Sequence, residues 1–236
     1  MTSLTAIASG QGSERPAATL PQSWLFWAAI GAGISYMIPV LLQSYPTITI
    51  FWKGAGVGLL AAWAARNAWN FDGRLIAAVL GLGALADMVL ESDFLVGGAI
   101  FGTGHMVAIY FYLRNRRENL STSQLWLALL LVPLATYIAW SMPYDRTQAT
   151  QAGLYSLFVT AMAAAAWVSR FPRYRTGLGA LMFVISDLFI FSRFGPMEGS
   201  RLPDFLVWPL YFGGQALIAW GVVDTLTKEA ERREAF

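Results

Sequence analysis

The sequence contains no cysteine, a single histidine and few charged residues. The absence of cysteine excludes disulfides, thiolate catalysis and metal sites with cysteine ligands. The lone histidine, His105, argues against a zinc site built from several histidines and against haem held by two of them. Charged residues make up 13% of the 236 residues, roughly half of the fraction typical of soluble domains. The composition therefore favours a membrane protein.

Apolar residues make up 56% of the chain, and they fall in runs of about twenty from Trp24 almost to the C-terminus. A helix of this length crosses the roughly 30 Å of hydrocarbon in a bilayer. The runs predict eight helices, at residues 23–42, 47–65, 74–91, 94–113, 123–140, 149–169, 175–192 and 203–224. Short connections make consecutive helices antiparallel neighbours. The expected fold class is all-α, an integral membrane bundle of eight transmembrane helices.

The two ends of the chain differ from these runs. Residues 1–22 are small, polar and aperiodic, which predicts a disordered N-terminal tail. The first apolar run is too long for a cleaved secretory signal and is followed at once by another run. We expect residues 23–225 to form one eight-helix transmembrane domain and residues 226–236 to form a charged C-terminal tail.

Basic residues divide unevenly between the two sides of the predicted bundle. With eight spans, the tails and the even-numbered connections share one side, which holds twelve basic residues: Arg15, Arg66, Arg74, Arg114, Arg116, Arg117, Arg170, Arg173, Arg175, Lys228, Arg232 and Arg233. The opposite side holds Arg146, Arg193 and Arg201. This positive-inside bias places both termini in the cytoplasm. We expect a multi-pass protein of the bacterial inner membrane, in contact with membrane lipids and with no nucleic-acid partner; the oligomeric state is left open.

Four ionisable residues lie inside the predicted spans: Lys53, Asp87, His105 and Asp187. A charge at membrane depth is costly unless it faces a partner or water, so such residues are candidates for function. At about 1.5 Å per residue, all four lie in the outer half of the bilayer, as do Tyr211 and Gln215 of the last span. This agreement in depth predicts one polar cavity that opens toward the outer leaflet. Tyr211 and Gln215 can also simply hydrogen-bond neighbouring helices.

The four ionisable residues have structural interpretations as well. Lys53 can extend its amine to the outer interface. Asp87 stands one turn before Glu91 and can belong to a hydrated helix end. His105 can be a hydrogen-bonded core residue. Asp187 is flanked by apolar residues, so a solvated position suits it poorly.

Several stretches, in order, resemble the YhhN family of eight-helix membrane proteins. They are Lys53 early in the second span, GALADMVLE with Asp87, FLVGGAIFGTGHMVAIY with His105, LYSLFVTAM with Tyr155, GALMFVISDLFIF with Ser186 and Asp187, and WPLYFGGQALIAWG with Tyr211 and Gln215. Together they cover about residues 50–220. The chain departs from the family pattern at Gly54, where proline is usual, at Ala86, where glycine is common, and at Ala108, where a tyrosine is expected and Tyr110 follows two residues later.

The characterised members of this family are lysoplasmalogenases. The resemblance therefore implies an ether-bond hydrolase that splits the vinyl ether of a lysoplasmalogen into a fatty aldehyde and a glycerophospho-base. Hydrolysis of an enol ether starts with protonation of the alkene carbon and gives an oxocarbenium ion that water captures. This chemistry needs one protonated carboxylic acid and one carboxylate, as in glycosidases. Asp187, with the more apolar neighbours, is expected to be the acid and Asp87 the base.

The other candidates are expected to support this pair. Lys53 would neutralise the ionised carboxylate or bind the lipid phosphate, and His105 would orient water or relay protons. Tyr211 and Gln215 would hold the glycerol oxygens. Further candidates for contact with the lysophospholipid substrate are Tyr155, Ser186, Glu91 and Tyr110, with Arg193 and Arg201 at the cavity mouth. No metal or other cofactor is expected.

Other functions are also open at this stage. A metal-dependent hydrolase could use the two aspartates with Glu91 and His105 around a hard cation, and chelators would then abolish its activity. A transporter or lipid-binding protein could use the same buried charges as a proton- or ion-coupled site. A serine hydrolase has little support, because the sequence contains no G-x-S-x-G motif.

Overall fold

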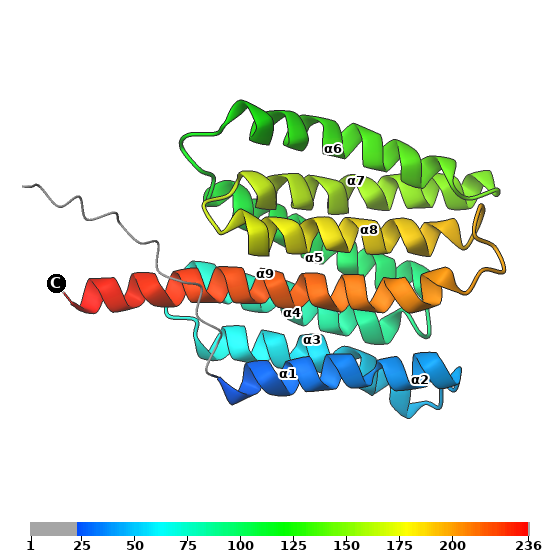
Figure 1. Ribbon diagram of the computed structural model, residues 1–236, viewed down its shortest axis with the longest axis horizontal. Helices are drawn as coiled ribbons and strands as arrows, with labels where there is room; N and C mark the ends of the chain where they lie inside the picture. The colour runs from blue at the N-terminus through cyan, green and yellow to red at the C-terminus, as the bar shows by residue number, and fades with distance from the viewer. Residues whose placement is uncertain (1–22, 236) are drawn as a thin grey trace, which may run out of the picture.

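The computed structural model describes residues 23–235, so the predicted N-terminal tail at 1–22 lies outside the described residues. Over this range the chain forms helices and no β-strand, and the helices run side by side along the long axis of the molecule (Figure 1). They are α1 (Trp24–Ser35), α2 (Met37–Leu42), α3 (Ile48–Arg66), α4 (Phe71–Val89), α5 (Phe94–Arg114), α6 (Thr122–Ser141), α7 (Arg146–Val168), the π-helical turn η1 (Arg173–Gly177), α8 (Leu178–Ser192) and α9 (Leu202–Glu234).

Within residues 23–235, seven helical segments are long and apolar enough to cross a membrane, with α1 and α2 counted as one and η1 and α8 as another. This makes the protein an all-helical integral membrane protein. The one predicted span outside this set is the third, predicted at 74–91, which is α4; it has 19 residues, as α3 does, but carries Asp72, Arg74 and Asp87. It contacts α3 on one side and α5 on the other, so it is part of the same bundle.

The order of the helices in the bundle differs in one place from the prediction. The pairs α3 and α4, α4 and α5, α6 and α7, and α8 and α9 are neighbours both in sequence and in space. The prediction that consecutive helices always pack together is wrong for α5, which packs against α4 and α7, while α6 packs on α7 and α8. The connection at 115–121 is long enough to carry the chain to the far side of α7. As a result, α5, α7 and α8 meet around the site described below.

Polar caps determine where four of the helices begin. The side chains of Asn70, Asp93 and Asp145 each accept a hydrogen bond from the backbone N–H three residues later, at 2.8–3.0 Å. At the start of α6, Ser121 and Gln124 form a reciprocal capping box. Such caps satisfy backbone donors that have no partner within the helix. Two of them fix the first turns of α5 and α7, the helices that form the walls of the main cavity.

Two predicted spans are not continuous α-helices. The first breaks at Tyr36 because Pro39 has no N–H to donate to the carbonyl of Ser35 and its ring crowds that turn. The seventh opens with the π-helical turn η1, in which Gly177 packs against Trp167 so closely that a Cβ would lie 2.7 Å from the ring. The predicted ends of the other spans agree with the structure to within a few residues, apart from the last.

The last helix is longer than predicted. It was expected to end at residue 224, but α9 continues to Glu234, so most of the charged C-terminal segment is helical. Leu226 is buried, and its carbonyl accepts a hydrogen bond from Trp69 Nε1 at 2.9 Å. Lys228 pairs with Asp224 one turn earlier at 3.1 Å. These contacts extend the helix beyond its apolar part.

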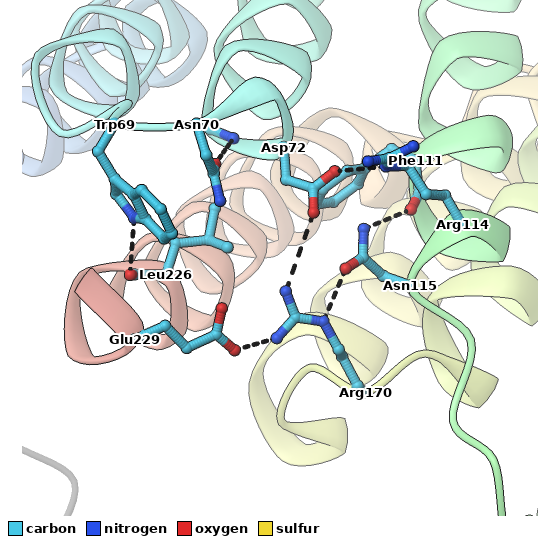
Figure 2. Close-up of polar contacts among 10 residues, drawn as sticks. Trp69, Asn70, Asp72, Phe111, Arg114, Asn115, Arg170, Leu226 and Glu229 are labelled. Carbon is cyan, nitrogen blue, oxygen red and sulfur yellow. Dashed lines mark hydrogen bonds and ion pairs between the residues drawn. The ribbon is translucent and has the colours of Figure 1, made fainter. Parts of the chain in front are cut away.

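Arg170 connects several helices at the end of the bundle where α9 terminates (Figure 2). Its Nε donates to Asn115 Oδ1 at 2.6 Å, and its guanidinium pairs with Glu229 of α9. It also lies 3.9 Å from Asp72 of α4, which accepts from Arg114 Nε at 3.1 Å. Charge-assisted bonds of this kind are among the stronger hydrogen bonds in proteins. They hold this end of the bundle together, and the candidate site lies toward the other end.

Candidate active site

A chain of three side chains joins α8, α7 and α5. The hydroxyl of Tyr155 donates to Asp187 Oδ2 at 3.0 Å and lies 3.2 Å from His105 Nε2. The Tyr155 oxygen is thus within hydrogen-bond distance of both the carboxyl and the imidazole. Asp187 and His105 are 5% and 4% exposed, so each places a polar group in the core of the bundle. His105 therefore reaches Asp187 through Tyr155.

The second carboxyl belongs to a different pair. Asp87 of α4 is 2% exposed, and its Oδ2 accepts a hydrogen bond from the Tyr211 hydroxyl of α9 at 2.7 Å. Gln215 is buried one turn further along α9. Gly83 faces both of these α9 side chains, since a Cβ there would lie 3.3 Å from Gln215 Nε2 and 3.6 Å from the Tyr211 hydroxyl. The small residue gives α9 room to approach α4.

Two phenylalanine rings connect the two polar groups. The ring of Tyr211 lies 5.8 Å from that of Phe101 and 4.9 Å from that of Phe183, both edge to face. The ring of His105 is stacked at 6.2 Å from that of Phe101 and lies edge to face at 5.1 Å from that of Phe183. Edge-to-face contacts at these distances are favourable. The two aspartates thus belong to separate hydrogen-bonded groups that are joined by aromatic packing.

A small void lies between these groups. It has a volume of about 20 Å³, and His105 and Gln215 are among its walls. A void of this size holds about one water molecule when polar partners line it. The space is too small for any organic ligand.

The main cavity is bounded by α5, α7 and α8 and has a volume of about 650 Å³. Its apolar walls include Phe94, Leu95, Met106, Leu154, Phe158, Ile190, Phe191 and Phe194. Its polar lining consists, among the described residues, of Asp187, Tyr155, Thr103, Gln148 and Gln151. Several of its apolar residues, such as Leu95 and Leu154, are also exposed on the outside of the bundle. The cavity is therefore open sideways, through surfaces that face lipid in a membrane.

The ion pair of Lys53 is with Glu91 and not with either aspartate. The Lys53 amine pairs with Glu91 Oε1 at 2.5 Å, and the two side chains are 19% and 30% exposed. Glu91 lies four residues after Asp87, just beyond the end of α4, beside Lys53 in the second turn of α3. The prediction of one cavity shared by Lys53, Asp87 and Asp187 is thus not what the structure shows, because only Asp187 of these three lines the main cavity.

Other expected substrate contacts also lie elsewhere. Tyr110 is 53% exposed, because it stands five residues after His105 on α5, about 140° further around the helix. Ser186 is fully buried and donates to the Val207 carbonyl of α9 at 3.1 Å, so its hydroxyl serves helix packing.

The two arginines that were expected at the cavity mouth have partners of their own. Arg193 pairs with Asp204 at 3.0 Å. The guanidinium of Arg201 lies over the ring of Phe205, 5.5 Å from its centre. Neither of them lines the main cavity.

The sequence analysis did not identify Gln148 and Gln151, which line the main cavity beside Tyr155. Their spacing in the sequence could have identified them as neighbours of Tyr155. Positions 148, 151 and 155 recur at three and four residues, so they share one face of a helix. Phe101 and Phe183 were missed as well, and no pattern distinguishes them from other apolar core residues.

The acidic side chains and the histidine do not converge as metal ligands would. Among residues 23–235, no group of three or more His, Asp or Glu side chains could hold a metal ion. Glu91 is paired with Lys53, and His105 is bound to Tyr155.

The fold and site together define an integral membrane protein with a buried carboxyl group at the wall of an apolar cavity. The chain belongs to the YhhN family, whose family model matches residues 48–222. This confirms the resemblance identified in the sequence. No curated protein matches the chain, and no solved structure matches it.

Proposed function

We propose that the protein is a lysoplasmalogenase-like hydrolase that cleaves the vinyl ether bond of a lysoplasmalogen. The observation that supports this most directly is the position of Asp187. Its carboxyl and the Tyr155 hydroxyl are the ionisable groups among the described residues that line an otherwise largely apolar cavity of about 650 Å³. A single-chain lipid needs such a cavity, and an enol ether needs a carboxylic acid to protonate it. Membership of the YhhN family is consistent with this activity.

The proposed reaction uses one carboxyl twice. Asp187 gives its proton to the alkene carbon remote from the ether oxygen, which leaves positive charge shared by that oxygen and the adjacent carbon. The resulting carboxylate stabilises the cation and then takes a proton from water as the water oxygen bonds to the cationic carbon. The hemiacetal breaks its bond to the glycerol oxygen, and its hydroxyl proton passes to that oxygen. The products are a fatty aldehyde and a glycerophospho-base, and Asp187 is protonated again.

The other buried groups then have supporting roles. Tyr155 orients the Asp187 carboxyl through their hydrogen bond, and His105 positions Tyr155. Asp87, once expected to be the base, is held by Tyr211 and lies outside the cavity lining. We assign it to the packing of α4 against α9.

The test is to offer purified protein two lysolipids that have the same chain and head group. One carries a vinyl ether and the other an ester. We expect aldehyde from the first and no free fatty acid from the second, because only the vinyl ether is activated by protonation at carbon. Proteoliposomes that contain the protein should also take up no more of the intact vinyl-ether lipid than the amount that the protein binds. Uptake without aldehyde would replace this proposal with a transporter.

We further propose that α4 crosses the membrane, giving eight spans with both termini in the cytoplasm of a bacterial cell, in its inner membrane. The contacts of α4 with α3 and α5 support this, as does its length of 19 residues. Two of its three charged residues lie near one end, where Asp72 pairs with Arg114. The third, Asp87, is bonded to Tyr211 in the core. Charges satisfied in this way are compatible with a membrane span.

The absence of cysteine makes this topology easy to test. Ser44, in the connection at 43–47, and Glu118, in the connection at 115–121, are both exposed, and α3, α4 and α5 lie between them. A membrane-impermeant thiol reagent applied to intact spheroplasts should label Ser44→Cys and should label Glu118→Cys only after the membrane is opened. The unmodified chain is the control, because it has no thiol. Labelling of both positions from the same side would show that the span count is wrong.

A further inference from the structure

The cavity-facing side of α7 carries a polar stripe. Gln148, Gln151 and Tyr155 all line the main cavity, and they follow one another at intervals of three and four residues. Neither glutamine side chain has a hydrogen-bond partner among the described residues. The backbone N–H of Gln148 is used by the Asp145 cap, which leaves its carboxamide free for a ligand. Two carboxamides therefore lie along the path from the end of the bundle to the Tyr155–Asp187 pair.

The two glutamines lie at the end of the cavity where α5 and α7 begin and α8 ends. Phe94 and Phe194 are in ring contact at 6.0 Å, and the Tyr144 N–H donates to the Phe194 carbonyl at 2.9 Å. These contacts bring the start of α5, the start of α7 and the end of α8 to the same end of the bundle. From Arg146, the first residue of α7, the rise along the axis is about 3 Å to Gln148, about 8 Å to Gln151 and about 14 Å to Tyr155.

The deepest lining residues are apolar. Met106 of α5 and Phe158 of α7 each lie twelve residues into their helix, about 18 Å from the end of the bundle. Between them and the start of α5, the wall contains Gly98 and Gly102, and a Cβ at either glycine would meet nothing within 4 Å. A hydrocarbon chain can lie along this open strip of α5.

We infer that Gln148 and Gln151 bind the glycerol and phosphate oxygens of a single-chain glycerophospholipid, whose chain runs past Asp187 along Gly98 and Gly102 toward Met106 and Phe158. This inference rests on the proposed function for the identity of the bond at Asp187. Along α7, the polar lining residues precede the apolar Phe158, in the same order in which the head group of such a lipid precedes its hydrocarbon chain. The phosphate is nearest the end of the bundle, the glycerol follows, and the ether carbon reaches the carboxyl.

The chemistry of the stripe suits this ligand. A carboxamide both donates and accepts, so it can bind a glycerol hydroxyl as well as a phosphate oxygen. The nearby cations are already engaged. Arg146 donates to the Pro143 carbonyl at 2.6 Å, and Arg193 pairs with Asp204. The glutamines are the polar groups of the described lining that remain between the bundle end and Tyr155.

The experiment measures binding, so that it does not depend on turnover. Purified protein in detergent is titrated with an ester lysophosphatidylethanolamine and, separately, with a monoacylglycerol of the same chain. In the double variant Gln148→Leu/Gln151→Leu, we expect the Kd for the lysophospholipid to rise about tenfold or more, since hydrogen bonds to charged groups are among the stronger ones. The Kd for the monoacylglycerol should change less. Thr150→Val is the matched control, because Thr150 is exposed on the same helix and does not line the cavity.

The outcomes separate this inference from the proposed function. An unchanged Kd for the lysophospholipid in the double variant, with folding equal to that of the control, overturns the head-group assignment whatever the enzyme cleaves. An equal loss for both lipids also overturns it, because it shows a general effect on the cavity. Weaker lysophospholipid binding in the double variant, together with no aldehyde release by the unmodified chain, would support the head-group site and reject the vinyl-ether hydrolase.

Discussion

Replacing Asp187 by asparagine is expected to reduce aldehyde release from a vinyl-ether lysolipid by about 10²- to 10⁴-fold, the usual contribution of a general acid or base. Asparagine keeps the size and the hydrogen-bond acceptor that Tyr155 uses, but it has no proton to give to carbon. The Kd for the lipid should stay within a few-fold, because the cavity walls are unchanged. The measurement is the initial rate of aldehyde formation at saturating lipid, with thermal unfolding as a check on folding.

Asp87→Asn is the matched comparison. Asp87 has the same chemistry and similar burial, and it accepts from Tyr211 at 2.7 Å, but it lies outside the main cavity. An asparagine oxygen can accept the same hydrogen bond, so we expect a loss of about tenfold or less, in line with one weakened bond. If Asp87→Asn removes activity while Asp187→Asn retains it, the two carboxyls have been given the wrong roles. If neither variant loses activity, carboxyl catalysis is wrong altogether.

The proximity of several candidates along the bundle could be predicted from the sequence, because the position of a residue along a helix follows from counting residues. Asp87 accepts a hydrogen bond from Tyr211, and His105 reaches Asp187 through Tyr155. The helical segments themselves followed from the apolar runs in the same way. The exceptions have local causes, such as the break at Tyr36 before Pro39 and the extra turns of α9 held by Trp69.

The pairing of these residues could not be predicted from the sequence, because it depends on how each helix is rotated against its neighbours. Periodicity shows which residues share a face, but in lipid it does not show which face meets which helix. Lys53 could reach an aspartate or Glu91 from the same position on α3, and the structure pairs it with Glu91. The packing of α5 against α7 rather than α6 had no sequence signature either, and this packing creates the cavity.

The site also depends on how closely α8 and α9 approach each other, because one carries Asp187 and the other carries Tyr211. The two helices meet at a pair of glycines. A Cβ at Gly214 would lie 2.5 Å from the Gly179 carbonyl oxygen, and a Cβ at Gly179 would lie 2.5 Å from the Gly214 oxygen. Real side chains do not tolerate such distances to backbone atoms, so any larger residue must separate the helices.

Gly214→Ala is therefore expected to destabilise the protein by about 1–3 kcal/mol, the usual cost of overpacking a core. The adjacent Gly213→Ala is the control, since a Cβ there meets only the flexible Met182 Cε at 3.1 Å. The control should keep or raise the stability, because alanine favours a helix by up to about 1 kcal/mol over glycine. Thermal unfolding in detergent should give a lower Tm for Gly214→Ala than for both the control and the unmodified chain. Equal Tm values for the two variants would mean that the helices can move apart freely, and the Gly179–Gly214 contact would then not be what fixes Asp187 relative to Tyr211.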